Sequence, residues 1–254
     1  MIVRQPKPPA TVKKLWNEKN PFFSHYYTSY SLLVPESENY ILRSSRPFGK
    51  NSQHAEAVKK CFAQEGNHSR IHAEFAKKFY EQGYDFTGFL KFYRWISYEV
   101  PEKYCSKNFN LVGAAASEQL NTAISVATLQ LEQLDQGEGE TLNMLKWHFL
   151  EEIEHREVIF DLMVEAKVSW FLRAYVMFNF FIGFSFWIAF GAIKLGFQDG
   201  SAKKLKFWWD ALVHSSYMSL LFFISSLRFL WPSYHPKDEY LPKQFYELQK
   251  NFVV

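Results

Sequence analysis

The spacing of apolar residues predicts that most of this chain is helical. Apolar side chains recur at alternating intervals of three and four residues over residues 51–82, 85–100, 108–136 and 141–166. This interval places them on one face of an α-helix. Gly83, Pro101 and Gly137 mark expected helix ends. We therefore expect an all-α protein in which residues 51–166 form a helical bundle.

The two ends of the chain lack this periodicity. Residues 1–50 contain several prolines and turn-forming residues, together with aromatic residues such as Trp16 and Tyr26. We expect an irregular N-terminal arm, with a short strand or helix near residues 26–34, that packs onto the bundle. A disordered segment would contain fewer aromatic residues. Residues 233–254 are expected to form a C-terminal tail, and they contain no recognisable motif.

Two uncharged runs follow the bundle and predict a hydrophobic helical hairpin over residues 167–232. Residues 174–193 are long enough to span a bilayer, and residues 211–227 form a shorter run. If both helices spanned, the lysines between them would lie opposite the bundle, which the positive-inside rule disfavours for a cytoplasmic bundle. A hairpin lying in the membrane interface avoids this conflict. Burial within the protein or in a homodimer is the alternative.

Composition narrows the expected partners. Aromatic residues make up 19% of the 254 residues, which indicates contact with lipid or with an apolar ligand. The net charge of +3 is too small to indicate nucleic-acid binding. The two cysteines, Cys61 and Cys105, make no disulfide framework, and the N-terminus lacks the apolar segment of a signal peptide. We expect a cytoplasmic protein, either soluble or associated with a membrane.

Ionisable residues interrupt the apolar faces of three predicted helices. The pairs Glu65/His68 and Glu152/His155 have the Glu-x-x-His spacing of carboxylate-bridged metal sites in helical bundles. Unpaired charges inside a bundle cost several kcal/mol each, and a bound metal would compensate for them. The predicted metal ligands are Glu65, His68, His72, Glu118, His148, Glu152 and His155.

The ligand types favour a dinuclear centre. Two sets of His and carboxylate that share Glu118 suit two Fe ions, with Mn or Zn as alternatives. The absence of thiolate ligands argues against a structural zinc site. Glu118 and Glu152 are the expected catalytic carboxylates, and Glu151 competes with Glu152 for the bridging position.

Other candidates are weaker. Di-iron bundles usually add one Glu from a fourth helix. Glu99 and Glu102 are candidates for this position, unless the additional histidines replace it. Cys61, His54 and His214 are each interpreted as ordinary core residues.

The motifs resemble those of a known family. The stretch Trp147-His148-x-x-Glu151-Glu152-Ile153-Glu154-His155 is similar to the hallmark of the bacterial predicted metal-dependent hydrolase family, which is grouped with ferritin-like proteins. Glu65-x-x-His68-x-x-x-His72, the Ala-rich run around Glu118, and Phe160-Asp161 also match over residues 45–230. Gln119 stands where the family often has His, so it is not an expected ligand. The resemblance implies a ferritin-like four-helix metal-binding bundle.

Three functions are consistent with these features. The first is a dinuclear non-haem metal oxidase or oxygenase, most simply with iron, that uses O₂ on an apolar or lipid-like substrate. The alternative is a metal-dependent hydrolase that uses a metal-bound water. The second alternative is a non-catalytic, membrane-associated metal-binding protein. The membrane, if there is one, would be the bacterial inner membrane.

Overall fold

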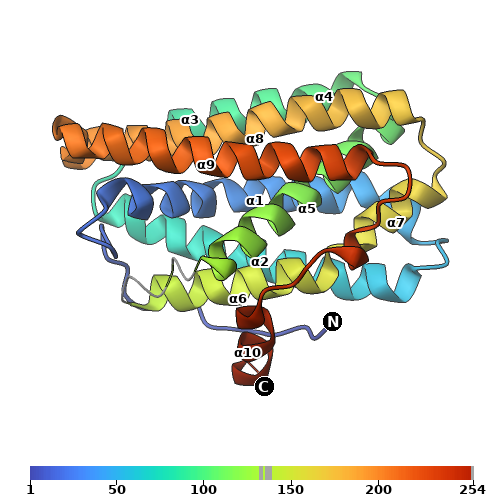
Figure 1. Cartoon of the computed structure of the whole chain (residues 1–254), viewed down its shortest axis with the longest axis horizontal. Helices are drawn as coiled ribbons and strands as arrows, with labels where there is room; N and C mark the ends of the chain where they lie inside the picture. Colours follow the sequence, from blue (N-terminus) through green and yellow to red (C-terminus); the bar gives the residue numbers. More distant parts are fainter. Residues whose placement is uncertain (132–133, 135–138, 253–254) are drawn as a thin grey trace.

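Every regular element in the described part of the chain is helical, which confirms the expected all-α class. The computed structural model describes residues 1–131, 134 and 139–252. Short turns of π or 3₁₀ helix are η1 (Trp95–Glu99), η3 (Ser201–Lys203) and η4 (Pro236–Asp238). The α-helices in Figure 1 are α1 (Pro21–Gly49), α2 (Ala55–Glu81), α3 (Thr87–Arg94), α4 (Val100–Tyr104), α5 (Lys107–Gln130), α6 (Glu140–His155), α7 (Val158–Glu165), α8 (Trp170–Asp199), α9 (Leu205–Leu230) and α10 (Lys243–Asn251).

Local signals set several helix ends. The Asn20 side chain caps α1 by accepting a hydrogen bond from the backbone N–H of Phe23 at 2.9 Å. Gly83 follows the end of α2 with a φ of +90°, as predicted, because glycine has no Cβ to oppose this conformation. The predicted end at Gly137 lies outside the described residues, and the helix expected over residues 108–136 is described as α5.

The expectation of an irregular arm over residues 1–50 is wrong for residues 21–49, which form α1. Every residue from Phe22 to Val34 is buried, so this part of α1 is enclosed on all sides. Such a helix has no polar face, and its sequence therefore lacks the periodicity of a surface helix. Pro35 and Pro47 lie inside α1, where tertiary packing offsets their low helix propensity.

Two other predicted helices differ in detail. The chain does not end its helix at Pro101, because the π turn η1 leads directly into α4 and Pro101 lies in the first turn of α4. Proline is tolerated there since the first turn does not need its N–H. The helix expected over residues 141–166 is divided into α6 and α7 by a turn at Arg156 and Glu157.

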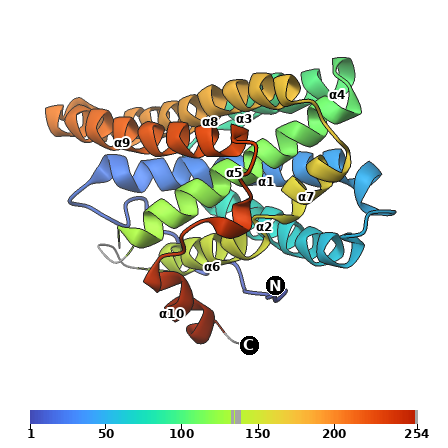
Figure 2. The ribbon, with the colours of Figure 1, turned by 45° about the vertical axis from the view of Figure 1, so that its right-hand side comes forward.

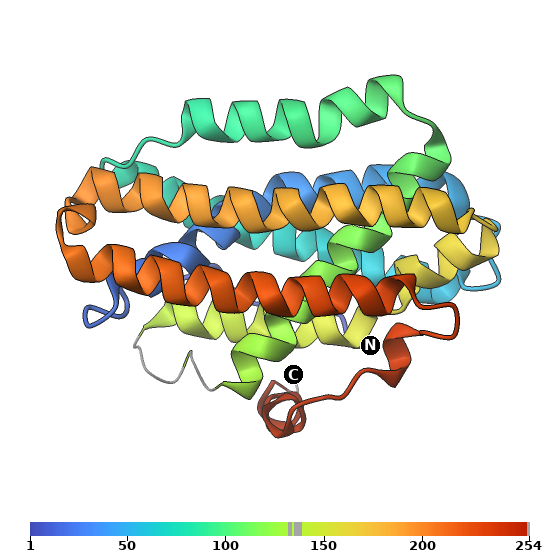
Figure 3. The ribbon, with the colours of Figure 1, turned by 45° about the horizontal axis from the view of Figure 1, so that its top comes forward.

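Helix α1 is central to the packing. It contacts α2 on one side and α8 on the other, and α5 crosses beside it. Helices α2 and α6 lie on one side of α1 and α5, while α3, α8 and α9 form a layer on the opposite side, as Figures 1 and 3 show. The helices that carry the predicted site, α2, α5 and α6, therefore face α1 rather than the segment 85–100.

The expected hydrophobic hairpin consists of α8 and α9, which pack against each other. Among the described helices, α8 is long and apolar enough to cross a membrane by length and composition. In its most apolar stretch, 28% of the residues are buried. Both α8 and α9 contact α1 and α5, so the hairpin lies along the bundle.

Both ends of the chain lie near α6. In Figure 2 the N-terminal segment and α10 are on the side of the molecule away from α8 and α9. Within the tail expected over residues 233–254, Lys243–Asn251 form α10, which contacts α5 and α6.

Candidate metal centre

The seven residues predicted as metal ligands lie together in the interior. They come from α2, α5 and α6, and each is at most 1% exposed. The rings of His72 and His148 have centroids 4.8 Å apart, and those of His68 and His148 are 4.3 Å apart. The helical periodicity therefore located a real cluster, and the role of its members as ligands stays a prediction.

One half of the cluster surrounds the Nε2 atom of His155. This atom lies 2.9 Å from Oε1 of Glu65 and 3.3 Å from Oε2 of Glu118. Glu65, Glu118, His155 and Cys61 each present one potential ligand atom, and these atoms all lie within 4.8 Å of one another. The four donors could hold one metal ion.

The other half of the cluster surrounds Oε1 of Glu152. This atom lies 3.2 Å from Nε2 of His148 and 3.4 Å from Nδ1 of His68. Together with Glu38, these residues form a second group whose ligand atoms also lie within 4.8 Å of one another. They could hold a second metal ion.

Two carboxylates connect the halves. Glu152 presents Oε1 to the group of His148, and its Oε2 lies 3.5 Å from Nε2 of His155. Glu65 Oε1 faces His155 and also lies 3.9 Å from Nδ1 of His68. The geometry thus favours Glu152 and Glu65 as shared carboxylates. This differs from the expectation that Glu118 is shared, because α5 brings Glu118 to the His155 half.

Glu38 of α1 was missed in the sequence. Its side chain is fully buried, and neither carboxylate oxygen has a hydrogen-bond partner among the described residues. The expected candidates lie elsewhere, since Glu99 pairs with Arg94 and Glu102 pairs with Arg43 at partly exposed positions. Glu38 went unrecognised because its segment was expected to be irregular.

With Glu38, the four helices present the acidic and histidine pattern of a carboxylate-bridged dinuclear site. Such sites take one Glu from each of two helices and a Glu-x-x-His pair from each of two others. Here the lone carboxylates are Glu38 and Glu118. Glu38 therefore takes the position of the fourth-helix Glu, and additional histidines are not needed to replace it.

Cys61 lies closer to the cluster than expected for an ordinary core residue, because it belongs to the His155 group. Burial raises the pKa of its thiol. The protonated thiol is a weak ligand, since metal ions bind the thiolate.

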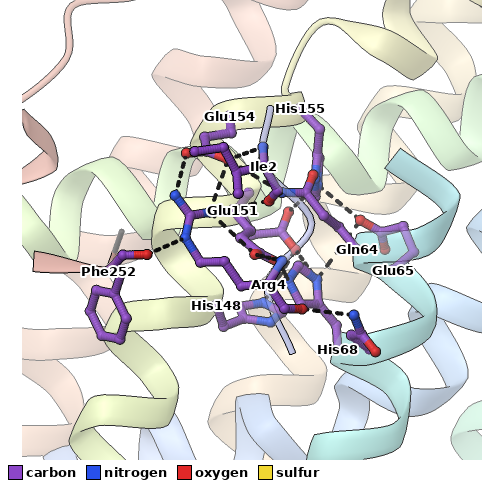
Figure 4. A network of polar contacts seen from close by, with 12 residues as sticks. Ile2, Arg4, Gln64, Glu65, His68, His148, Glu151, Glu154, His155 and Phe252 are labelled. Atoms are coloured by element: carbon purple, nitrogen blue, oxygen red, sulfur yellow. Dashed lines mark hydrogen bonds and ion pairs between the residues drawn. The ribbon is translucent and has the colours of Figure 1, made fainter. Parts of the chain in front are cut away.

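Two of the histidines have a hydrogen-bond partner at the ring nitrogen that points away from the cluster, as Figure 4 shows. His155 Nδ1 lies 3.1 Å from Oε1 of Gln64, which leaves Nε2 directed at the carboxylates. His68 Nε2 lies 3.2 Å from Oε2 of Glu151, which leaves Nδ1 directed inward. A hydrogen bond at one ring nitrogen fixes the other as the metal-binding atom. Glu151 thus supports His68 and does not take the bridging position.

The N-terminal segment closes this side of the cluster. Arg4, which is 3% exposed, donates hydrogen bonds from Nη1 to Oε1 of Glu151 at 3.2 Å and from Nη2 to Oε1 of Glu154 at 2.9 Å. Its guanidinium therefore compensates the buried charge of Glu151. Arg4 lies in a segment without helical periodicity, so its sequence does not indicate that this residue contacts the cluster.

Burial perturbs the ionisable groups of the cluster in opposite directions. It raises the pKa of the Glu118 carboxyl above its usual range, and the charge on Glu65 adds to this effect. Burial lowers the pKa of His72 to about 3. Burial also opposes ionisation of Glu152, but the neighbouring histidines outweigh it and hold the pKa of Glu152 below its usual range.

The cluster fits a bound metal. Its donors are carboxylates and imidazoles in a dry interior, where isolated charges are costly. The two oxygens of Glu38 lack any hydrogen bond from the described residues, and such orphaned atoms need a cation or protons. Divalent metals displace these protons, and mixed imidazole and carboxylate ligands suit Fe, Mn or Zn.

Comparison with known proteins agrees with the motifs. A family model described as a predicted metal-dependent hydrolase matches residues 3–240. It covers the resemblance found over residues 45–230 and extends it to include α1, Glu38 and Arg4. No curated protein and no solved structure matches the chain.

Proposed function

Because the chain belongs to the predicted metal-dependent hydrolase family, we propose that it is a hydrolase with two metal ions in the buried cluster. The observation that carries the proposal is the pair of ligand groups that meet at Glu152. When bound, the metals would supply an activated water and polarise the substrate. The family match and the buried donors support this proposal.

The residues of the chain divide into two sets of ligands. Glu38, His68 and His148 would hold one metal, and Glu65, Glu118 and His155 would hold the other. Glu152 would bridge them, and Glu65, which faces both His155 and His68, would be shared as well. Gln64 and Glu151 would fix the orientation of two histidine rings, and the aromatic residues around the cluster would exclude bulk water.

The test begins with elemental analysis of protein expressed with Fe, Mn and Zn all available. We expect about two metal ions per chain, as in dinuclear sites. Chelation should abolish hydrolysis of a panel of esters and phosphoesters, and the native metal should restore it. The control is Glu74→Gln, on the exposed side of α2. Hydrolysis that survives complete metal removal contradicts the proposal.

A second candidate is an oxidase or oxygenase with two iron ions. The observation that favours it is Glu38, which completes the ligand pattern of ferritin-like di-iron and di-manganese proteins. This function predicts two Fe per chain and O₂ consumption when the reduced protein meets its substrate. Protein that contains Zn and consumes no O₂ would support hydrolysis instead. Metal without any turnover would support a binding role.

We also propose that the layer of α3, α8 and α9 contacts a membrane surface. Along α8 the exposed side chains form a stripe, which consists of Phe171, Tyr175, Phe178, Ile182, Phe186 and Phe190. Exposed residues of α9 continue this apolar face, and lysines including Lys203, Lys204 and Lys206 lie at one end of the hairpin. Large exposed apolar surfaces are typical of membrane or protein contacts.

The packing of the hairpin favours an orientation in which α8 and α9 lie parallel to the membrane surface. Helices α8 and α9 pack along α1 and α5, which supports a hairpin that lies on the membrane surface together with the bundle. The protein should sediment together with phosphatidylglycerol vesicles. The double variant Phe178→Asp with Phe186→Asp should reduce the fraction that sediments. A homodimer that buries the same face, seen by analytical ultracentrifugation without vesicle binding, would contradict membrane contact.

A further inference from the structure

A cavity of about 310 Å³ lies between α1, α5, α8 and the segment that contains η1. Its volume is within the range of small-molecule sites. None of the described residues that line it carries a formal charge, and most are aromatic or aliphatic. The cavity therefore suits an uncharged, largely apolar group.

The inner end of the cavity adjoins the metal centre. Tyr30 lines the cavity, and its hydroxyl lies 2.7 Å from Nε2 of His148. The same hydroxyl donates a longer hydrogen bond to Oδ1 of Asn121 at 3.4 Å. Ser117, which precedes Glu118, also lines this end. A ligand in the cavity would thus have one end beside His148, a predicted ligand of one metal.

The outer end reaches the apolar face of the molecule. Tyr175 of α8 and Ile96 of η1 both line the cavity and are 62% and 39% exposed. Tyr175 belongs to the exposed stripe of α8, which is part of the face proposed to contact a membrane. A hydrocarbon chain could therefore enter the cavity from that surface.

The cavity is elongated along α8. Its lining on this helix extends from Tyr175 to Ile188, which corresponds to about 20 Å at the rise of an α-helix. A cavity of about 150 Å³ accommodates one benzene molecule, so this volume corresponds to about twelve carbon atoms. Its length and its volume together match an extended chain better than a compact ring system.

We propose that this cavity binds the hydrocarbon chain of an acyl or alkyl substrate, with the reactive end of the substrate at Tyr30, beside the metal centre. This inference rests on the proposed function for the reaction at the metals, but chain binding itself does not require it. Tyr30 and Asn121 are positioned to hydrogen-bond a polar group at the inner end of the chain.

Gly183 of α8 offers a specific test. It lines the cavity, and a Cβ added there would meet its nearest neighbour, Trp187, at an ordinary contact distance of 3.9 Å. Gly183→Leu should therefore fill the cavity without displacing the backbone. The matched control is Gly66→Leu, since Gly66 is also inside a helix but is exposed with nothing within 4 Å of an added Cβ.

The probe is cis-parinaric acid, a fluorescent fatty acid, titrated into protein as purified and into protein stripped of metal. We expect saturable binding in both forms, weakened at least tenfold by Gly183→Leu and unchanged by Gly66→Leu. Displacement by dodecanoate would identify a free acid as the source of the chain. Displacement only by phosphatidylcholine vesicles would identify a membrane lipid.

Absence of binding, or equal binding to the Gly183→Leu protein, would overturn the inference. So would displacement by cholesterol but by neither source of chains. Because the stripped protein is included, chain binding without metal-dependent hydrolysis would separate this inference from the proposed function. Hydrolysis of short-chain esters without chain binding would do the reverse.

Discussion

The carboxylate of Glu151 lies 3.2 Å from Nε2 of His68, while the carboxylate of the next residue, Glu152, faces Nδ1 of the same ring at 3.4 Å. Two adjacent acids thus contact the two ring nitrogens of one imidazole. The outer acid is neutralised by Arg4, and the inner acid is directed at both ligand groups. Their different partners explain why only one of them is placed to bridge metals.

The outer contact predicts the behaviour of Glu151→Gln. The amide loses the charge that pairs with Arg4 and holds His68, so metal affinity should fall by about 10–100-fold while the helices persist. Competition with a chromogenic chelator measures this affinity. Glu74→Gln, at an exposed position of α2, should leave it unchanged. Equal affinities for the two variants would show that Glu151 does not support a ligand.

The division of ligands predicts metal content. Glu38→Ala and Glu118→Ala each remove a ligand from a different group, so each should leave about half of the bound metal. Glu152→Ala should leave almost none, because both groups face this carboxylate. Elemental analysis per chain distinguishes these outcomes. Full metal content in the Glu152→Ala protein would contradict a shared carboxylate. His155→Ala should remove at least the metal ion that Glu118 and His155 would hold.

The predictable parts of the site lie on amphipathic helices. In α2 and α6 the ionisable residues interrupt an otherwise apolar face, so the sequence alone indicates that Glu65, His68, Glu152 and His155 point inward. Their burial agrees with this expectation. The Glu-x-x-His spacing then predicts that these inward-pointing residues bind metal.

The remaining parts depend on tertiary structure. Glu38 lies in α1 beyond its fully enclosed part, and Pro35 and Pro47 argued against a helix there. Arg4 reaches Glu151 across 147 positions of sequence, which no local pattern can indicate. The cavity beside Tyr30 is formed by segments from α1 to α8, so it exists only after these helices pack.

The buried acid of Glu38 should destabilise the metal-free protein. A buried polar group without a hydrogen-bond partner costs about 1–3 kcal/mol, so Glu38→Leu should raise the free energy of unfolding of chelated protein by about this amount. The same variant should gain less stability from added metal than the wild type. Urea unfolding with and without metal measures both effects. The comparison variant is Glu36→Leu, at a half-buried position beside Arg94, and it should not respond differently to metal.

A pH dependence arises far from the cluster, where Oδ2 of Asp199 at the end of α8 lies 2.9 Å from Nε2 of His25. Burial raises the pKa of Asp199, but hydrogen bonds from His25 and Ser201 outweigh it and lower the pKa to about 2. The unfolded value is about 3.9, so the unfolded chain binds the proton more readily. Asp199 therefore stabilises the fold above about pH 4, and this contribution is lost as the pH falls towards 2. Asp199→Asn should destabilise the protein at pH 6, and the difference from the wild type in urea unfolding should shrink as the pH falls from 5 to 3. A difference that stays constant over this range would show that ionisation of Asp199 does not contribute to stability.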